Sequence, residues 1–141
     1  MDDRHGSYDL VSEFARLDTQ RLARQGMPEF VYAEGKTPEQ VAAIMERLTE
    51  RHGCALASRA APAHAEAVQS RMPSAHFDPI SRLISAGSMP VQAVGLVVVT
   101  AAGTSDLPTA EEACGVLTFL GDRVQPLYDV GVAGVHRLLA H

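Results

Sequence analysis

The sequence feature that most constrains the fold is the apolar run "VGLVVVTA" at residues 94–101. A strand with one face in water alternates apolar and polar residues, and this run does not alternate. The run therefore predicts a strand buried on both faces, as in a parallel sheet covered by helices. A helix pattern follows and stops at Gly121. Its apolar stripe comprises Ala110, Ala113, Cys114 and Leu117.

The strand-then-helix pattern occurs a second time. "VQPLYDV" (124–130) predicts the next strand, and "AGVHRLLAH" (133–141) predicts the next helix. This β-α-β-α order is typical of the opening of a doubly wound α/β sheet, which usually has about five strands. We therefore expect residues 91–141 to be the first part of a larger domain and the sequence to be a fragment. The alternative is a small complete α/β domain that takes its strands from residues 29–130.

Residues 1–90 carry different signals and predict a small N-terminal helical and α/β region. The clearest signal is "TPEQ" (37–40), a capping-box pattern with proline at the first helical position. Apolar residues then recur at helical spacing, and Gly53 closes the helix. These apolar positions are Val41, Ile44, Met45 and Leu48.

The other elements of this region are predicted from residue spacing and from the positions of glycine and proline. Leu10, Phe14 and Leu17 lie at helical spacing, and Pro79 is expected at an edge or bend of a strand. "AGSMPVQ" (86–92) has the glycine, serine and proline of a linker, which places the domain boundary near residue 90. The predicted elements are helices over 8–24 and 62–72 and strands over 29–33, 54–58 and 75–85.

Composition and cysteine usage exclude several classes of protein. The formal net charge of -5 argues against nonspecific nucleic-acid binding. No apolar run approaches the ~20 residues that span a bilayer. Cys54 and Cys114 are the two cysteines and form no CxxC pair, which fits a reducing cytoplasm and predicts core packing for both. The histidines show no HExxH or H-x3-H pairing, so no metal site is predicted.

The turn after residues 94–101 is the first candidate site. Ligands of parallel α/β sheets bind beyond the carboxyl ends of the strands, where Gly103, Thr104, Ser105 and Asp106 follow. Glycine allows close approach of a ligand, and a helix N-terminus with hydroxyls nearby favours phosphate or carboxylate. Equally, Asp106 can simply cap the next helix while the hydroxyls satisfy the turn. The turn lacks both GxGxxG and a P-loop lysine, so the residues alone leave both interpretations open.

Three segments together resemble a known family. "GTSDLPTAEEA" (103–113) followed by "YDVGVAGVHRLL" (128–139) strongly resembles the opening of the LarB family of carboxylase/hydrolases, and "RQGMPEFVYAEGKTPEQ" (24–40) resembles its N-terminal region. The part that starts near Val94 is similar to PurE, the aminoimidazole-ribonucleotide carboxylase. The resemblance implies a flavodoxin-like, PurE-type parallel three-layer sheet that is incomplete in this chain.

The resemblance also implies a reaction. LarB-type proteins add CO2 or bicarbonate to the pyridinium ring of nicotinic acid adenine dinucleotide and hydrolyse its phosphoanhydride to release AMP. This begins synthesis of the nickel-pincer cofactor of lactate racemase. No tightly bound cofactor is implied, Mg²⁺ is a candidate ion, and an octamer is expected for the intact family. The family's cysteine nucleophile belongs to a later region than this sequence contains, and neither Cys54 nor Cys114 matches it. We therefore expect part of the ligand site without the nucleophile.

The serine-aspartate turn supplies one half of the site that the resemblance implies. Ser105 and Asp106 match the pair that contacts substrate in PurE-like proteins, with Gly103 and Thr104 shaping the pocket. Asp106 is expected to bond a ribose hydroxyl or a metal-bound water, or to serve only as the helix cap.

The second half follows the next strand. His136 and Arg137 match a histidine-arginine pair by type, which makes His136 the candidate catalytic proton shuttle and Arg137 a ligand for phosphate or carboxylate. Asp129 is expected to orient ribose or His136. Lys36, in the N-terminal pattern, is a candidate for contacting anionic groups of the ligand across a subunit boundary. Each of these residues has the alternative of a solvated surface role.

Two other functions remain as alternatives. One is a PurE-type carboxylase or mutase of purine synthesis, although such enzymes start directly at the strand equivalent to residue 94. The other is a noncatalytic nucleotide-binding module, which the missing family cysteine makes reasonable for this chain.

Overall fold

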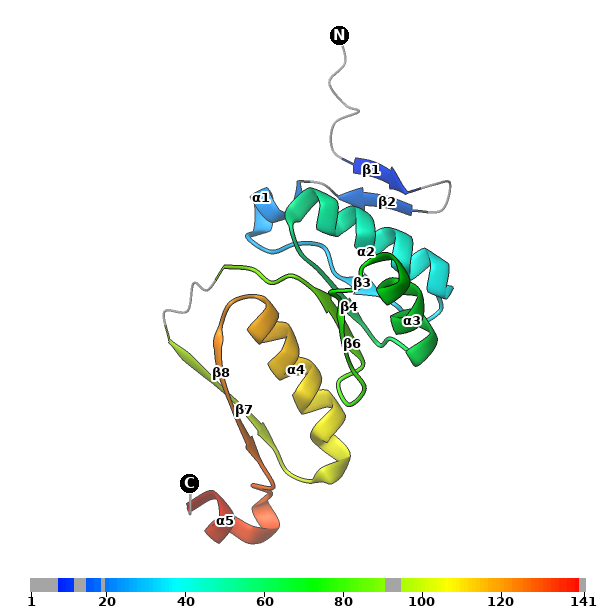
Figure 1. Cartoon of the computed structure of the whole chain (residues 1–141). Coiled ribbons are helices and arrows are strands. Elements are labelled where there is room, and N and C mark those ends of the chain that lie inside the picture. Colours follow the sequence, from blue (N-terminus) through cyan, green and yellow to red (C-terminus); the bar gives the residue numbers. More distant parts are fainter. Residues whose placement is uncertain (1–7, 12–14, 19, 91–94, 140–141) are drawn as a thin grey trace.

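The computed structural model of the chain describes residues 8–11, 15–18, 20–90 and 95–139. Within these residues the strands form an antiparallel pair β1–β2, a four-stranded sheet in the order β3-β4-β6-β5, and a parallel pair β7–β8 (Figure 1). The strands are β1 (Tyr8–Val11), β2 (Ala15–Asp18), β3 (Val31–Tyr32), β4 (Ala55–Ser58), β5 (His76–Asp78), β6 (Leu83–Ala86), β7 (Leu96–Ala101) and β8 (Arg123–Tyr128). The α-helices are α1 (Arg21–Gln25), α2 (Pro38–His52), α3 (Pro62–Arg71), α4 (Leu107–Phe119) and α5 (Val135–Leu139), with 3-10 turns η1 (Thr104–Asp106) and η2 (Val132–Gly134).

Helix α2 confirms the capping-box prediction. The Gln40 backbone N–H donates to Thr37 Oγ1 at 3.3 Å, and the Thr37 N–H donates to Gln40 Oε1 at 3.0 Å. At the other end, Gly53 has φ 76° and donates its N–H to the Thr49 carbonyl at 2.8 Å. One face of the helix is buried, comprising Val41, Ala42, Ile44, Met45 and Leu48. Local sequence signals suffice here because cap, stripe and stop all agree.

The four-stranded sheet separates two apolar cores. Successive side chains of a strand point to opposite faces. Accordingly Ala55 and Ala57 of β4 join α2 and α3 in the larger core, whereas Leu56 joins Leu83 of β6 in a smaller core on the opposite face. β5 and β6 form the antiparallel hairpin that replaces the single strand expected over 75–85, and Pro79 lies in its turn, at the expected bend.

The predicted helix over residues 8–24 is wrong. The chain instead forms the β1–β2 hairpin and the short helix α1, with Val11 paired to Ala15. Val11 and Leu17 are 7% and 5% exposed and pack onto the core beneath α2. Apolar residues three or four positions apart fit either pattern over so short a stretch, and tertiary packing decided between them. Phe14, used for that prediction, lies outside the described residues.

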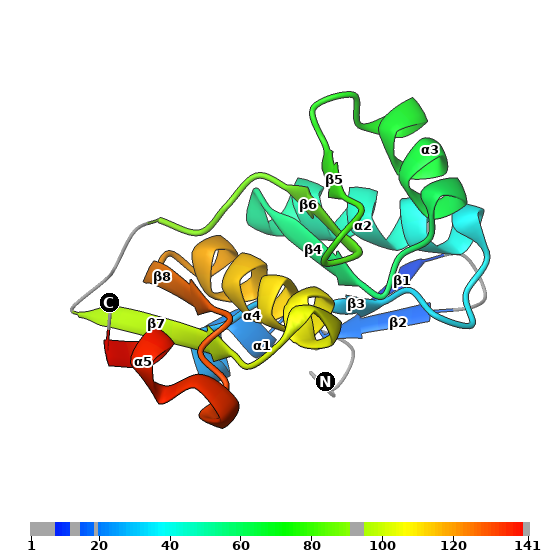
Figure 2. The same ribbon diagram turned by 90° about the horizontal axis from the view of Figure 1, so that it is seen from below.

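Residues 95–139 confirm the β-α-β unit. β7 and β8 pair in parallel from Leu96 with Arg123 to Ala101 with Tyr128, and α4 connects them. The expected burial of β7 on both faces is wrong for its first half, because Leu96 and Val98 are 50% and 51% exposed. Among the described helices α4 packs along this two-stranded sheet, so one face stays open (Figure 2). Residue 94 and residues 140–141 of the predicted elements lie outside the described residues.

Helix α4 joins the two parts of the molecule. Figure 2 shows it between the β7–β8 pair and the four-stranded sheet. Phe119 forms an edge-to-face contact with Phe30, with ring centroids 6.0 Å apart, and its carbonyl accepts the Met89 N–H at 3.0 Å. An ion pair of 3.0 Å links Glu112 of α4 to Arg59 after β4. These contacts hold one face of α4 against the N-terminal sheet.

Candidate functional site

The loops that follow β7 and β8 meet at the carboxyl edge of the parallel pair. The Val130 N–H donates to the Ala101 carbonyl at 3.2 Å, which ties the two strand ends together. The first loop carries the turn of residues 103–106, and the second carries Asp129 and leads into α5. The structure therefore brings the two groups of candidate residues to one edge of the sheet, as parallel pairing requires.

The turn itself is short, hydrogen-bonded and open to solvent. The Asp106 N–H donates to the Gly103 carbonyl at 3.0 Å, and the Gly103 N–H donates to Asp106 Oδ2 at 3.3 Å. The side chains of Thr104, Ser105 and Asp106 are exposed. Asp106 precedes α4 as expected, but its side chain makes no capping bond to the first turn of that helix. Its backbone is already helical (φ −89°, ψ −13°), so the carboxylate turns back onto Gly103.

A cavity of about 380 Å³ adjoins this turn. It lies between the end of β7 and the first two turns of α4, and Asp106 supplies its charged side chain. The cavity is lined by Val99, Thr100, Ala101, Ala102, Asp106, Thr109, Ala110 and Ala113. A ligand can therefore reach the turn from solvent while part of it packs on small apolar residues.

An ion pair occupies the end of β8. Arg137 Nη1 donates to Asp129 Oδ1, and Asp129 has a left-handed backbone with φ 61°. His136 lies on the same short helix as Arg137 with its side chain exposed. Sequence reasoning placed Asp129 beside ribose or His136, and the pairing with Arg137 was not foreseen, because it depends on how η2 folds the chain back. The assignment of these residues to substrate remains a prediction.

Lys36 belongs to a different part of the molecule. It lies in the loop between β3 and α2, where its Nζ donates to the Tyr32 carbonyl at 2.8 Å. Its own carbonyl lies 3.0 Å from His64 Nε2. Figures 1 and 2 both show this loop well apart from the loop between β7 and α4. Lys36 is therefore not part of the strand-end group of residues within one described chain, and its contact with a ligand stays a prediction.

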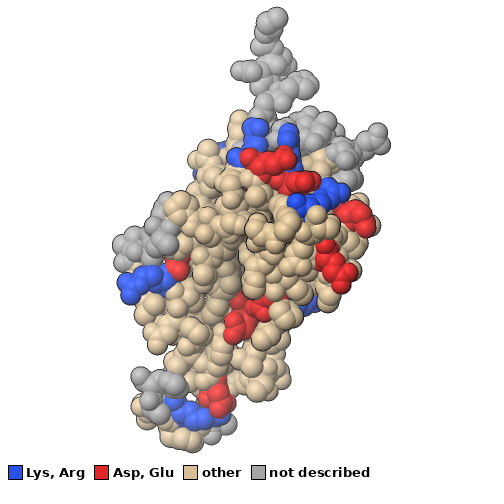
Figure 3. Space-filling model, viewed as in Figure 1, with Lys and Arg blue, Asp and Glu red and all other residues tan. Residues whose placement is uncertain are grey.

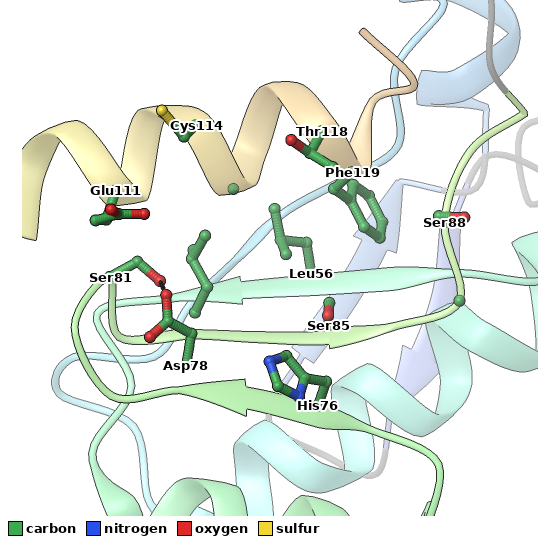
Figure 4. Close-up of a pocket in the computed structure, with 13 residues that line it drawn as sticks. Leu56, His76, Asp78, Ser81, Ser85, Ser88, Glu111, Cys114, Thr118 and Phe119 are labelled. Atoms are coloured by element: carbon green, nitrogen blue, oxygen red, sulfur yellow. Dashed lines mark hydrogen bonds between the residues drawn. The ribbon is translucent and has the colours of Figure 1, made fainter. Parts of the chain in front are cut away.

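Sequence reasoning missed a second cavity, of about 370 Å³, between α4 and the N-terminal sheet (Figure 4). Its residues come from β4, β5, β6, the segment after β6, and one face of α4. They are Leu56, His76, Asp78, Ser81, Leu83, Ser85, Gly87, Ser88, Glu111, Cys114, Gly115, Thr118 and Phe119. The sequence signal was the spacing of Glu111, Cys114, Gly115 and Thr118 along one helical face.

The two cysteines differ in environment. Cys54 is 5% exposed in the smaller core, and burial raises the pKa of its thiol, as expected for core packing. Cys114 is only half-buried, and its Sγ lies 3.5 Å from the Tyr128 hydroxyl. Its predicted place on a core-packing stripe is therefore wrong in part, because the residue lines the second cavity.

Tyr128 should ionise at unusually high pH. Its hydrogen bond with Cys114, then burial, then a hydrogen bond with Glu111 raise the pKa of the phenol above its ordinary value of 10.0. Because the neutral phenol is favoured in the folded chain, this contribution to stability is complete below pH 10.0 and declines as the pH rises beyond it. A titration of tyrosinate absorbance should show a late phase that Tyr128→Phe removes. Because a hydrogen bond with Glu34 also raises the pKa of Tyr32, the comparison is made in a Tyr32→Phe background, where a late phase that survives Tyr128→Phe would contradict this.

The described residues contain no cluster of three or more His, Cys, Asp or Glu that could hold a metal ion. Nor does any described helix have the length and hydropathy needed to cross a membrane.

Comparison with known proteins identifies the family. Residues 8–88 match the model of the LarB/PurE-like N-terminal domain. An uncharacterized protein of Methanocaldococcus jannaschii is 33% identical to the chain over 138 residues, covering 93% of this chain and 54% of that protein. The chain thus spans about half the length of this curated relative. The matched region contains the capped helix α2 and the whole four-stranded sheet, and on this evidence the chain belongs to the LarB/PurE-like family.

Proposed function

We propose that the protein takes part in a LarB-type reaction on nicotinic acid adenine dinucleotide. In this reaction CO2 or bicarbonate supplies a carboxyl group to the pyridinium ring, and water cleaves the phosphoanhydride to release AMP. The product would be a precursor of the nickel-pincer cofactor. The observation that carries the proposal is the solvent-open turn of residues 103–106 beside the Asp129–Arg137 pair, in a chain whose residues 8–88 match this family.

Each residue of the strand-end site has a role in the proposal. The hydroxyls of Thr104 and Ser105 donate to phosphate oxygens, and Gly103 lets the ligand approach the backbone. Asp106 accepts from a ribose hydroxyl. Arg137 binds the anionic phosphoanhydride, for which its planar guanidinium is suited. It does so either by breaking its ion pair with Asp129 or while keeping it. His136, exposed at the same edge, exchanges a proton with the substrate or with water.

The activity is tested with the intact protein, nicotinic acid adenine dinucleotide and carbon-13-labelled bicarbonate. The expected result is release of AMP together with a pyridine mononucleotide that has gained one labelled carboxyl group. Turnover of a carboxyaminoimidazole ribonucleotide without these products would support the PurE-type function instead. Binding of the dinucleotide with no turnover of either compound would support the noncatalytic nucleotide-binding module.

Replacing Arg137 should weaken the ligand at the strand ends. A hydrogen bond to a charged group contributes about 1.5–3 kcal/mol, so Arg137→Ala should weaken binding of the dinucleotide by roughly 10-fold or more in calorimetric titration. The matched control is Arg71→Ala, since Arg71 is also a surface arginine, paired with Glu46 at 3.0 Å on the N-terminal domain. Equal affinities for the two variants would contradict the role of Arg137.

A further inference from the structure

The second cavity is built as a slot between a helix and a sheet. Figure 4 shows the face of α4 on one side and strands β4 to β6 on the other. The two sides meet at Gly115, where a Cβ would lie 2.4 Å from Leu83 Cδ1. Because Gly115 has no side chain, the helix lies close to the sheet, and Leu56, Leu83 and Phe119 form apolar walls. Apolar walls on two opposed, closely spaced elements suit a flat ring system.

The charge of the slot selects against anions. Asp78 and Glu111 lie on opposite sides of one end of the cavity in Figure 4, and no lysine or arginine is among its described lining residues. Figure 3 shows red acidic side chains near the middle of the face that carries α4. A phosphate or carboxylate inside would meet two carboxylates and no arginine or lysine. The occupant is therefore a neutral or cationic molecule that offers hydrogen-bond donors.

Neighbouring residues fix the Asp78 carboxylate in place as a hydrogen-bond acceptor. Burial raises the pKa of its carboxyl, but hydrogen bonds from the Ile80 N–H and from Ser81 outweigh this, and the net pKa is lowered. Its Oδ1 accepts the Ile80 N–H at 3.0 Å and its Oδ2 accepts the Ser81 hydroxyl at 2.8 Å. Ser81 is 3% exposed, so the carboxylate has a fixed orientation. The Ser81 backbone N–H also donates to this carboxylate, which leaves about one of its four acceptor sites for a ligand.

The remaining polar groups complete a donor-and-acceptor pattern. Ser85 and His76 lie on the strand side in Figure 4, and Thr118 lies on the helix side. Hydroxyl and imidazole groups can meet ring nitrogens as donors or acceptors. The volume of about 370 Å³ lies in the range of small-molecule sites.

We propose that this cavity binds an amino-substituted purine ring of the adenine class. The ring lies between the apolar walls, and its exocyclic amine donates to the carboxylates of Asp78 and Glu111. The ribose faces the opening, and any phosphate stays outside the acidic end. Such a ring belongs either to the far end of a dinucleotide held at residues 103–106 or to a separate adenosine compound.

Adenosine and inosine provide the direct test, because inosine carries a keto oxygen in place of the amine. Calorimetric titration should show one adenosine bound per chain and inosine bound at least about tenfold more weakly, the effect of losing a hydrogen bond to a charged group. Adenosine has neither a pyridine ring nor a phosphate, so this result is independent of the carboxylation reaction. Absence of adenosine binding, or equal affinity for both nucleosides, would overturn the site.

Adjacent glutamates on α4 give a matched pair of variants. Glu111→Gln removes a carboxylate from the cavity and should reduce the preference for adenosine over inosine. Glu112→Gln makes the same change one residue on, where the side chain pairs with Arg59, and should leave the preference unchanged. A loss of preference in both variants, or in neither, counts against the site. Competition between adenosine and nicotinic acid adenine dinucleotide identifies the bound ring as the end of the dinucleotide, and independent binding identifies a separate ligand.

Discussion

Replacing Gly87 with alanine should lower the free energy of unfolding by about 2–4 kcal/mol, the sum of backbone strain and overpacking. Gly87 has φ 64°, a left-handed conformation that costs a residue with a Cβ about 1–2 kcal/mol. The added Cβ would also lie 2.4 Å from the Gly53 carbonyl oxygen, which belongs to the backbone and has little freedom to move. The loss of unfolded-state entropy on adding a methyl group offsets only about 0.4–1 kcal/mol of this.

A second glycine separates strain from steric overlap. Gly35 has φ 82°, but a Cβ there would meet nothing within 4 Å. Gly35→Ala should therefore cost only the strain less the same entropy offset, in all about 1 kcal/mol. Urea denaturation followed by circular dichroism measures both variants. A Gly87→Ala variant no less stable than Gly35→Ala would show that the end of α2 and the segment after β6 do not approach as closely as described.

Gly87 also connects stability to the second cavity. It lines the cavity and touches Gly53, the residue that ends α2. One close approach of two backbone segments thus fixes the relative positions of the end of α2, the sheet and the cavity. Because the approach joins residues 34 positions apart, the sequence offered only the glycines themselves as a signal.

Local chemistry explains which elements could be predicted from the sequence. Helix α2 has a capping box, a proline at its first position, an apolar stripe and a closing glycine, and each signal acts over a few residues. The β-α-β unit of residues 96–128 was predicted from one unalternated apolar run and the helix pattern behind it. In contrast, the β1–β2 hairpin depends on Val11 and Leu17 joining the larger core, which spacing alone does not specify.

The candidate sites divide in the same way. The turn of residues 103–106 could be placed because a strand, a glycine and a helix start follow one another in sequence. The Asp129–Arg137 pair depends on the path of the chain after β8, which no local pattern specifies. The exposure of the first half of β7 depends on the number of strands described beside it. The adenine-type cavity forms because α4 faces a sheet built from residues 31–86. Since these segments are distant in sequence, no local pattern predicted the cavity.

Ile84→Ala should be among the most damaging truncations of a side chain in the N-terminal domain, since Ile84 is one of its largest fully buried side chains. Ile84 is 0% exposed in β6, between β4 and β5, and packs in the core shared with α2 and α3. Truncating a buried isoleucine to alanine costs about 2–5 kcal/mol, because apolar contacts are lost and a cavity remains. Domains of this size have a total stability of about 5–15 kcal/mol, so the loss should be visible as a large shift of the urea midpoint.

The same substitution a few residues earlier gives the control. Ile80 lies in the turn between β5 and β6 and is 55% exposed. Ile80→Ala should therefore change the free energy of unfolding by no more than about 0.5 kcal/mol. The difference between the two variants reports the burial of β6 and not the chemistry of isoleucine. If both variants lose the same stability, β6 is not the central strand of the N-terminal core. The strand side of the proposed adenine-type cavity would then be wrong as well.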